Sequence, residues 1–87
     1  MVPGNIMDSE KARQIIVDFL ETDYFCDIEE GDDPTFSSMG FDLSDKQEMI
    51  EPLRELIYSE TGSWVPLKTK DFSTVESLSS TIVSLLR

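Results

Sequence analysis

Histidine is absent from this 87-residue sequence, and cysteine occurs once, at Cys26. Without histidine, neither Cys26 nor any serine has the imidazole base that activates a catalytic nucleophile, and the usual Cys and His zinc sites cannot form. A lone cysteine also excludes an internal disulfide. The many carboxylates of so small a protein would lie on a wet surface that leaves their pKa values near normal. We therefore expect neither an enzyme nor a metal protein.

Positive charge is also scarce, because 7 Lys and Arg face 18 Asp and Glu, for a net charge of -11. A surface of this sign repels the phosphates of nucleic acids and anionic lipids. It is attracted instead to basic patches on other proteins, and self-repulsion favours a monomer. We expect a basic protein surface as the partner, with no nucleic acid and no membrane.

Long hydrophobic runs are missing too. No stretch approaches the roughly 18 apolar residues of a membrane span, and residues 1–7 lack the basic and apolar regions of a signal peptide. A cytoplasmic protein is the default expectation. The length allows one hydrophobic core, so we expect a flexible leader over residues 1–8 and a single domain over residues 9–87.

Apolar residues are present at helical spacing in three segments. The first helix is expected from Ser9 to Phe25, and an acidic, turn-rich loop follows from Cys26 to Ser38. This loop does not match a calcium-binding loop, because Ser38 stands where the closing glutamate belongs. The first helix has an apolar face, made of Ala12, Ile15, Ile16, Phe19 and Leu20.

The second helix is expected from Ser44 to Tyr58, with Pro52 in its interior. Proline lacks an N-H donor and its ring clashes with the carbonyl four residues back, so we expect a kink or a restart near Glu51. The apolar face of this helix consists of Met49, Ile50, Leu53, Leu56 and Ile57. Tyr58 and Trp64 are expected at the edge of the core.

A helix stop at residues 61–63 precedes a short element around residues 70–72. The last helix is expected to begin at a capping box formed by Ser73 and Glu76 and to run to the C-terminus. The sequence therefore predicts an all-α fold, a small bundle of three main helices plus one short helix. The predicted core comprises Ile15, Ile16, Phe19, Leu20, Phe36, Met39, Met49, Ile50, Leu53, Ile57, Val65, Val75, Leu78, Ile82 and Leu86.

Two segments, residues 36–44 and residues 65–78, together with the helix order, resemble the acyl carrier protein family. Residues 36–44 read Phe-Ser-Ser-Met-Gly-Phe-Asp-Leu-Ser, and residues 65–78 begin with Val-Pro. The likeness extends over about residues 9–87. It implies a carrier that presents a thioester-bound acyl or aminoacyl intermediate to enzymes of fatty acid or polyketide biosynthesis.

Carrier proteins attach 4'-phosphopantetheine to the serine of an Asp-Ser-Leu signature at the start of their second helix. This sequence has Asp42-Leu43-Ser44, with leucine and serine exchanged. In one alignment Leu43 takes the place of the serine and the attachment site is lost; the apolar positions six, seven, ten and fourteen residues later favour this alignment. In the other alignment Ser44 is the attachment residue, next to Asp42. Alternatively, Ser44 and Gln47 form a capping box, and the hydroxyl only caps the helix.

The resemblance also implies a recognition helix whose carboxylates meet Arg and Lys on biosynthetic enzymes or on a phosphopantetheinyl transferase. The matching residues are Asp42, Asp45, Glu48, Glu51 and Glu55. Two functions follow: a carrier that uses Ser44, or a carrier-fold protein that lacks the arm and acts as a docking or regulatory subunit. A helical adaptor unrelated to carriers is a third interpretation. A working carrier should have an interior that opens between the second and third helices, near residues 59–66.

Overall fold

In the part of the chain that the structure describes, three α-helices and one 3-10 turn make up the fold. The computed structural model describes residues 7–29 and 31–86. Its elements are α1 (Ser9–Tyr24), α2 (Leu43–Thr61), the 3-10 turn η1 (Thr69–Asp71) and α3 (Val75–Leu85). Within these residues the only extended pairing is an isolated antiparallel bridge between Thr35 and Thr74. The predicted all-α class, with three main helices and one short one, is confirmed.

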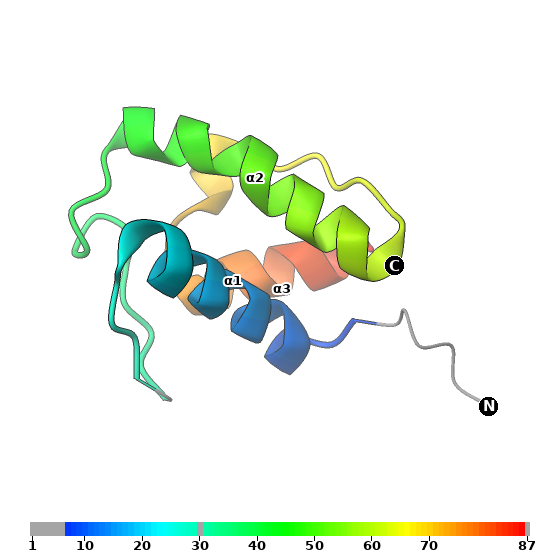
Figure 1. The fold of residues 1–87 in the computed structure, drawn as a ribbon, viewed down its shortest axis with the longest axis horizontal. Coiled ribbons are helices and arrows are strands. Elements are labelled where there is room, and N and C mark those ends of the chain that lie inside the picture. The colour runs from blue at the N-terminus through cyan, green and yellow to red at the C-terminus, as the bar shows by residue number, and fades with distance from the viewer. Residues whose placement is uncertain (1–6, 30, 87) are drawn as a thin grey trace.

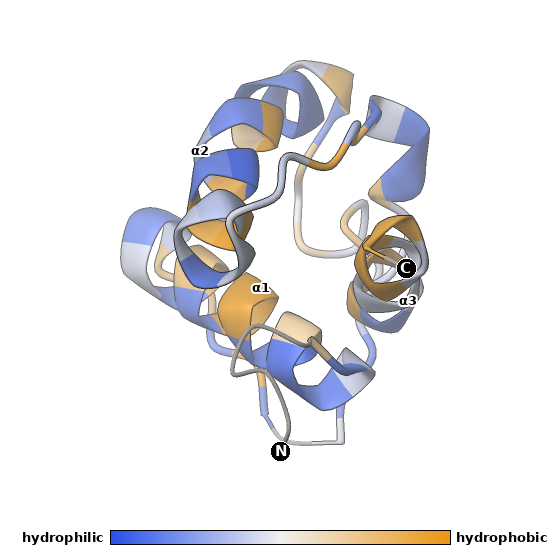
Figure 2. Ribbon diagram, turned by 90° about the vertical axis from the view of Figure 1, so that its right-hand side faces the viewer, coloured by the Kyte–Doolittle hydropathy of each residue, from blue (hydrophilic) through white to orange (hydrophobic). Residues whose placement is uncertain are grey.

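The three helices enclose one core. α1 packs mainly against α3 and more lightly against α2, while η1 bridges α2 and α3. Figure 1 shows α2 running back in the opposite sense to α1, with α3 behind them. The apolar stretches of all three helices turn toward the interior that they surround (Figure 2). The first and last helices of the chain therefore form the closest pair.

α1 begins and ends at well-defined caps. Asp8 is the N-cap, and its carboxylate accepts a hydrogen bond from the amide of Lys11 at 2.8 Å. Met7 before it is buried. Residues 7 and 8 thus belong to the domain, whereas residues 1–6 of the expected leader lie outside the described residues. Phe25 ends the helix in the left-handed conformation at φ 58°, which a bulky side chain rarely adopts.

α2 is longer than predicted and runs through Pro52 without a restart. Of the expected kink or restart near Glu51, the restart does not occur. Met49 and Leu53, on either side of the proline, are fully buried. The packing of these two side chains holds both halves in one helix. It offsets the cost of the interior proline, which is about 3 kcal/mol for the lost hydrogen bond and the ring clash together. Gly62 ends α2 at φ 76°, in agreement with the predicted stop.

The predicted capping box of the last helix is wrong by one residue. Thr74, not Ser73, is the N-cap of α3, and its hydroxyl accepts from the amide of Ser77 at 2.9 Å. The amide of Glu76 donates instead to Asp33, 43 residues earlier in the chain, at 2.8 Å. The cap is therefore local at Ser77, whereas the amide of Glu76 depends on a distant residue that the local sequence does not reveal.

The loop between α1 and α2 is tied to both α1 and α3. Phe36 donates its amide to Ser73 (2.9 Å), and Val75 donates to Pro34 (3.2 Å). The guanidinium of Arg13 on α1 donates to the carbonyls of Glu29 and Asp32. These bonds fix the loop across the end of the α1 and α3 pair.

Most of the predicted core is confirmed. Ile15, Met39, Ile50 and Leu86 are the exceptions, because they are partly exposed and pack on the edge of the core. The structure adds buried residues that the predicted set omitted: Met7, Ala12, Val17, Ile28, Leu67 and Phe72. Ile28 and Phe72 lie outside the helices, where periodicity gives no signal.

Candidate interaction site

The N-terminus of α2 is capped by aspartates, not by Ser44. The amide of Asp45 donates to the Asp42 carboxylate, and the amide of Asp42 donates to the Asp45 carboxylate, each at 3.0 Å. This reciprocal pair is a complete capping box. The predicted Ser44 and Gln47 box is therefore wrong, because the helix begins one residue before Ser44.

Leu43 and Ser44 occupy the first two positions of α2. Leu43 is 61% exposed. Ser44 is exposed as well, and the capping box formed by Asp42 and Asp45 does not use its hydroxyl. The Ser44 hydroxyl therefore lies exposed at the positive end of the helix dipole.

The buried face of α2 has a register that can be counted from its start. Met49, Leu53 and Ile57 are each 0% exposed. They follow Leu43 by six, ten and fourteen residues. Ile50, seven residues after Leu43, is partly buried at the edge of the core. Leu43 is thus the residue whose spacing to the core matches the first of the two alignments.

The opposite side of α2 carries an acidic outer face, made of Glu48, Glu51 and Glu55. All three are exposed, and their spacing of three and four residues places them on one side of the helix. Glu51 pairs with Arg54 at 2.9 Å. Glu48 and Glu55 have no ion pair among the described residues. Asp42 and Asp45, predicted to share this role, use carboxylate oxygens in the cap.

Tyr24 connects the end of α1 to the start of α2. Its ring packs edge-on against Phe41, with ring centroids 5.3 Å apart. Burial raises the pKa of Tyr24 above its ordinary value, and the negative charges of Glu48, Asp23 and Asp45 raise it further. Carboxylates of both helices therefore gather around one phenol, and Asp23 extends the acidic surface onto α1.

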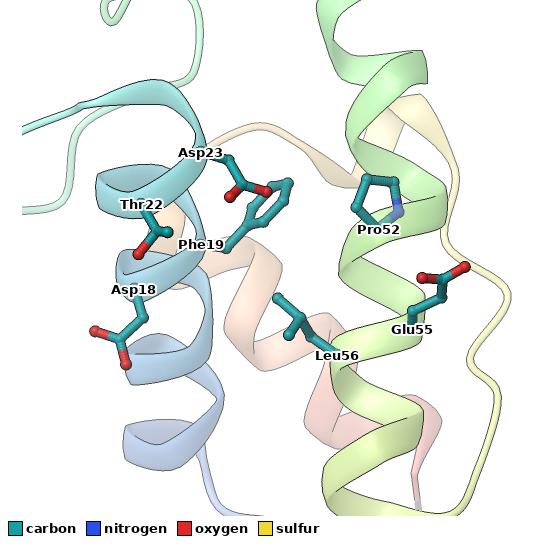
Figure 3. A pocket seen from close by; sticks show the side chains of 7 residues that line it. All are labelled: Asp18, Phe19, Thr22, Asp23, Pro52, Glu55 and Leu56. Carbon is teal, nitrogen blue, oxygen red and sulfur yellow. The ribbon is translucent and has the colours of Figure 1, made fainter.

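A groove of about 500 Å³ separates α1 from α2 and opens to solvent. Figure 3 shows Phe19 of α1 and Leu56 of α2 reaching toward each other across it, with Pro52 beside them on α2. Phe19 is only 4% exposed and forms the floor, whereas Leu56 is 41% exposed. The remaining lining residues of this α1–α2 groove are Asp18, Thr22, Asp23 and Glu55.

Sequence reasoning did not find this groove. It placed Leu56 on the apolar face of the second helix but not in the predicted core, and the structure leaves this residue 41% exposed. One signal was present in the sequence. The apolar face of α2, with Pro52 at its margin, is wider than the surface that one neighbouring helix can cover. The groove lies on the side of α2 away from residues 59–66, where an opening for cargo was expected (Figure 3).

An exposed aromatic pair joins the last turns of α2 to the segment that follows the helix. Tyr58 and Trp64 stack with ring centroids 4.5 Å apart, and the Arg54 guanidinium lies 5.4 Å from the Trp64 ring centroid. The two aromatic residues are 44% and 50% exposed. Their predicted place at the edge of the core is therefore wrong, because the two rings stack on each other at the surface.

The described residues offer few positions for other chemistry. None of their acidic and cysteine side chains form a group of three that could hold a metal ion. Cys26 is half-buried, and burial raises the pKa of its thiol. In the part of the chain that the structure covers, no helix is both long and apolar enough to cross a membrane. Ser44 is the one residue that the resemblance offers for a covalent cofactor.

Comparison with known proteins gives no relative. No protein-family model, no curated protein and no solved structure matches this chain. The proposed function therefore depends on the geometry of α2 and of the α1–α2 groove.

Proposed function

We propose that this chain is a carrier-fold docking domain that binds a basic surface of a biosynthetic enzyme and carries no phosphopantetheine arm. The observation that carries the proposal is the register of α2. The fully buried Met49, Leu53 and Ile57 follow Leu43 at the spacing that carrier proteins show after their modified serine. Leu43 then occupies the attachment position, and leucine cannot form a phosphodiester.

The outer face of α2 supports the docking half of the proposal. Glu48, Glu51 and Glu55 are exposed on one side of the helix, in a protein of net charge -11. A rigid row of carboxylates steers a basic partner surface and fixes its orientation. Docking through this face would weaken as salt rises.

A transferase assay tests the missing arm. The full chain is incubated with coenzyme A and a broad-specificity phosphopantetheinyl transferase, and its intact mass is measured. We expect no added mass, while a genuine carrier protein in the same tube gains one phosphopantetheine. A gain that disappears in Ser44→Ala would contradict this half of the proposal.

A carrier that uses Ser44 is the second candidate. Its support is the exposed Ser44 hydroxyl, which the aspartate capping box leaves free at the N-terminus of α2. An attached phosphate would lie at the positive end of the helix dipole. The same assay decides between the candidates, because only this one predicts modification.

Charge reversal tests the docking face. Glu48→Lys/Glu51→Lys reverses the outer face of α2, and Glu21→Lys/Asp27→Lys makes the same change in net charge away from it. We expect the parent and the control to capture the same partner from host extract. The α2 variant should bind this partner about tenfold more weakly, which corresponds to about 1.4 kcal/mol. Equal loss with both variants would contradict docking through α2. Circular dichroism checks that each variant folds.

A further inference from the structure

We propose that the α1–α2 groove is the docking site for a basic amphipathic helix of the partner protein, which inserts an apolar side chain flanked by lysine or arginine. This inference depends on the proposed docking function. It adds the place on this protein where the partner's apolar side chain binds. Helices recognised in this way lay an apolar face into a groove between two helices of the receptor.

The apolar part of the groove is incompletely covered. Phe19 closes the floor from α1, while Leu56 and the Pro52 ring form the wall on α2 (Figure 3). Leu56 keeps 41% of its surface in solvent, although its neighbours Leu53 and Ile57 are fully buried. Covering this surface with an apolar anchor would remove it from water.

The polar residues that line the groove include three carboxylates. Figure 3 shows Asp23 near the Phe19 ring, while Asp18 on α1 and Glu55 on α2 point away from the gap between the helices. The Asp18 carboxylate also accepts a hydrogen bond from the Gln14 amide at 2.9 Å. The lining contains no cation. The ion pairs of the described residues, Lys11 with Glu60, Arg13 with Glu76 and Arg54 with Glu51, leave these three carboxylates out. The groove is thus matched in charge to a basic ligand.

The shape of the groove favours a protein segment over the other ligands. Its volume of about 500 Å³ is within the range of small-molecule pockets, but those bury most of their ligand, and this groove is open. A second copy of this chain would bring another net charge of -11 against the acidic rim. A basic helix suffers neither disadvantage.

The probe for the test is an 18-residue peptide of leucine and lysine, with leucines spaced by three and four residues. Its controls are a peptide of the same composition in alternating order and a peptide with glutamate in place of lysine. Titration into the isotope-labelled full chain should shift the amide signals of Thr22, Asp23 and Leu56 most. Neither control peptide should reproduce those shifts.

Matched variants locate the binding energy. Leu56→Ala should weaken the peptide by about tenfold, whereas Leu85→Ala, on a leucine that is 40% exposed on α3, should change it less than about twofold. Glu55→Gln should weaken it by about threefold more than Glu21→Gln, because Glu21 lies on α1 outside this groove.

The outcomes separate this inference from the proposed function. Absence of binding, or binding that Leu56→Ala leaves unchanged, overturns the groove as the docking site. If Glu48→Lys/Glu51→Lys still abolishes capture of the natural partner, the docking function itself stands. If that double variant also has no effect, both proposals fail. Self-association that Leu56→Ala disrupts in sedimentation would identify a second copy as the occupant and overturn the basic helix.

Discussion

α1 meets its two neighbouring helices in different ways. Its contact with α3 is the most extensive one between described helices, and both helices contribute buried residues to the core, among them Ala12 and Ile16 from α1 and Leu78 and Ile82 from α3. Against α2 it makes a lighter contact and leaves a groove in which Leu56 stays exposed. The contact between α1 and α3 buries apolar side chains and so stabilises the fold. The contact between α1 and α2 leaves part of the apolar surface of these helices exposed.

Leucine truncation on the two sides should give the largest difference. Leu78→Ala removes a side chain that is 0% exposed and should lower the free energy of unfolding by about 2–5 kcal/mol. Leu56→Ala should lower it by less than about 1 kcal/mol, because so much of that side chain is already in water. Urea unfolding measures both. Similar costs would show that the groove belongs to the core.

Replacement of Pro52 tests whether the groove side of α2 retains strain. Pro52→Ala restores an N-H donor for the Glu48 carbonyl and removes the ring clash, so we expect a gain in unfolding free energy of about 1–3 kcal/mol. The measurement is urea unfolding with the parent as reference. A loss of stability would mean that the contacts of the proline ring outweigh the helical hydrogen bond.

At the start of α2, substitution of Asp42 should lower the stability of the protein, whereas substitution of Ser44 should not. Asp42→Ala removes the N-cap carboxylate and should cost about 1 kcal/mol. Ser44→Ala should change stability by less than about 0.5 kcal/mol, because that hydroxyl is exposed and surface positions cost little. Thermal unfolding of the two variants checks this, and the reverse order would restore Ser44 as the cap.

The titration of Tyr24 should give the smallest effect. In a Tyr58→Phe variant Tyr24 is the only tyrosine, so phenolate absorbance should give a midpoint above the ordinary 10.0. The folded protein then holds this proton more tightly than the unfolded chain. Its stabilising contribution is present below the unfolded pKa and falls as pH rises through the folded pKa.

Glu48→Gln tests the cause of this shift. The substitution should lower the Tyr24 midpoint without abolishing the rise, because burial is the larger cause. A midpoint at or below 10.0 in the Tyr58→Phe protein would show that the phenol is solvated and that the carboxylates do not gather around it.

Helix positions were predictable from the sequence because apolar spacing repeats over many residues. Caps were less so. Asp42 with Asp45 and Ser44 with Gln47 are both acceptable boxes, and local sequence does not choose between them. The choice follows from Phe41, which packs against Tyr24 and holds the chain extended at Asp42.

The candidate site was predictable only in part. The acidic outer face of α2 followed from spacing alone, since one helix determines it. The α1–α2 groove depends on how far two helices diverge, which neither helix encodes separately. The same limit applies to Asp33, whose role at the N-terminus of α3 arises from a contact across 43 residues.

The pairing of α1 with α3 also affects how fast the chain can fold. Residues 9–24 must find residues 75–85, so the closest helix contact closes a loop that includes all of α2. Closing such a loop costs entropy before any contact repays it, which slows folding relative to bundles of sequential neighbours. We expect folding in roughly milliseconds or longer in stopped-flow experiments, at the slow limit for small helical proteins.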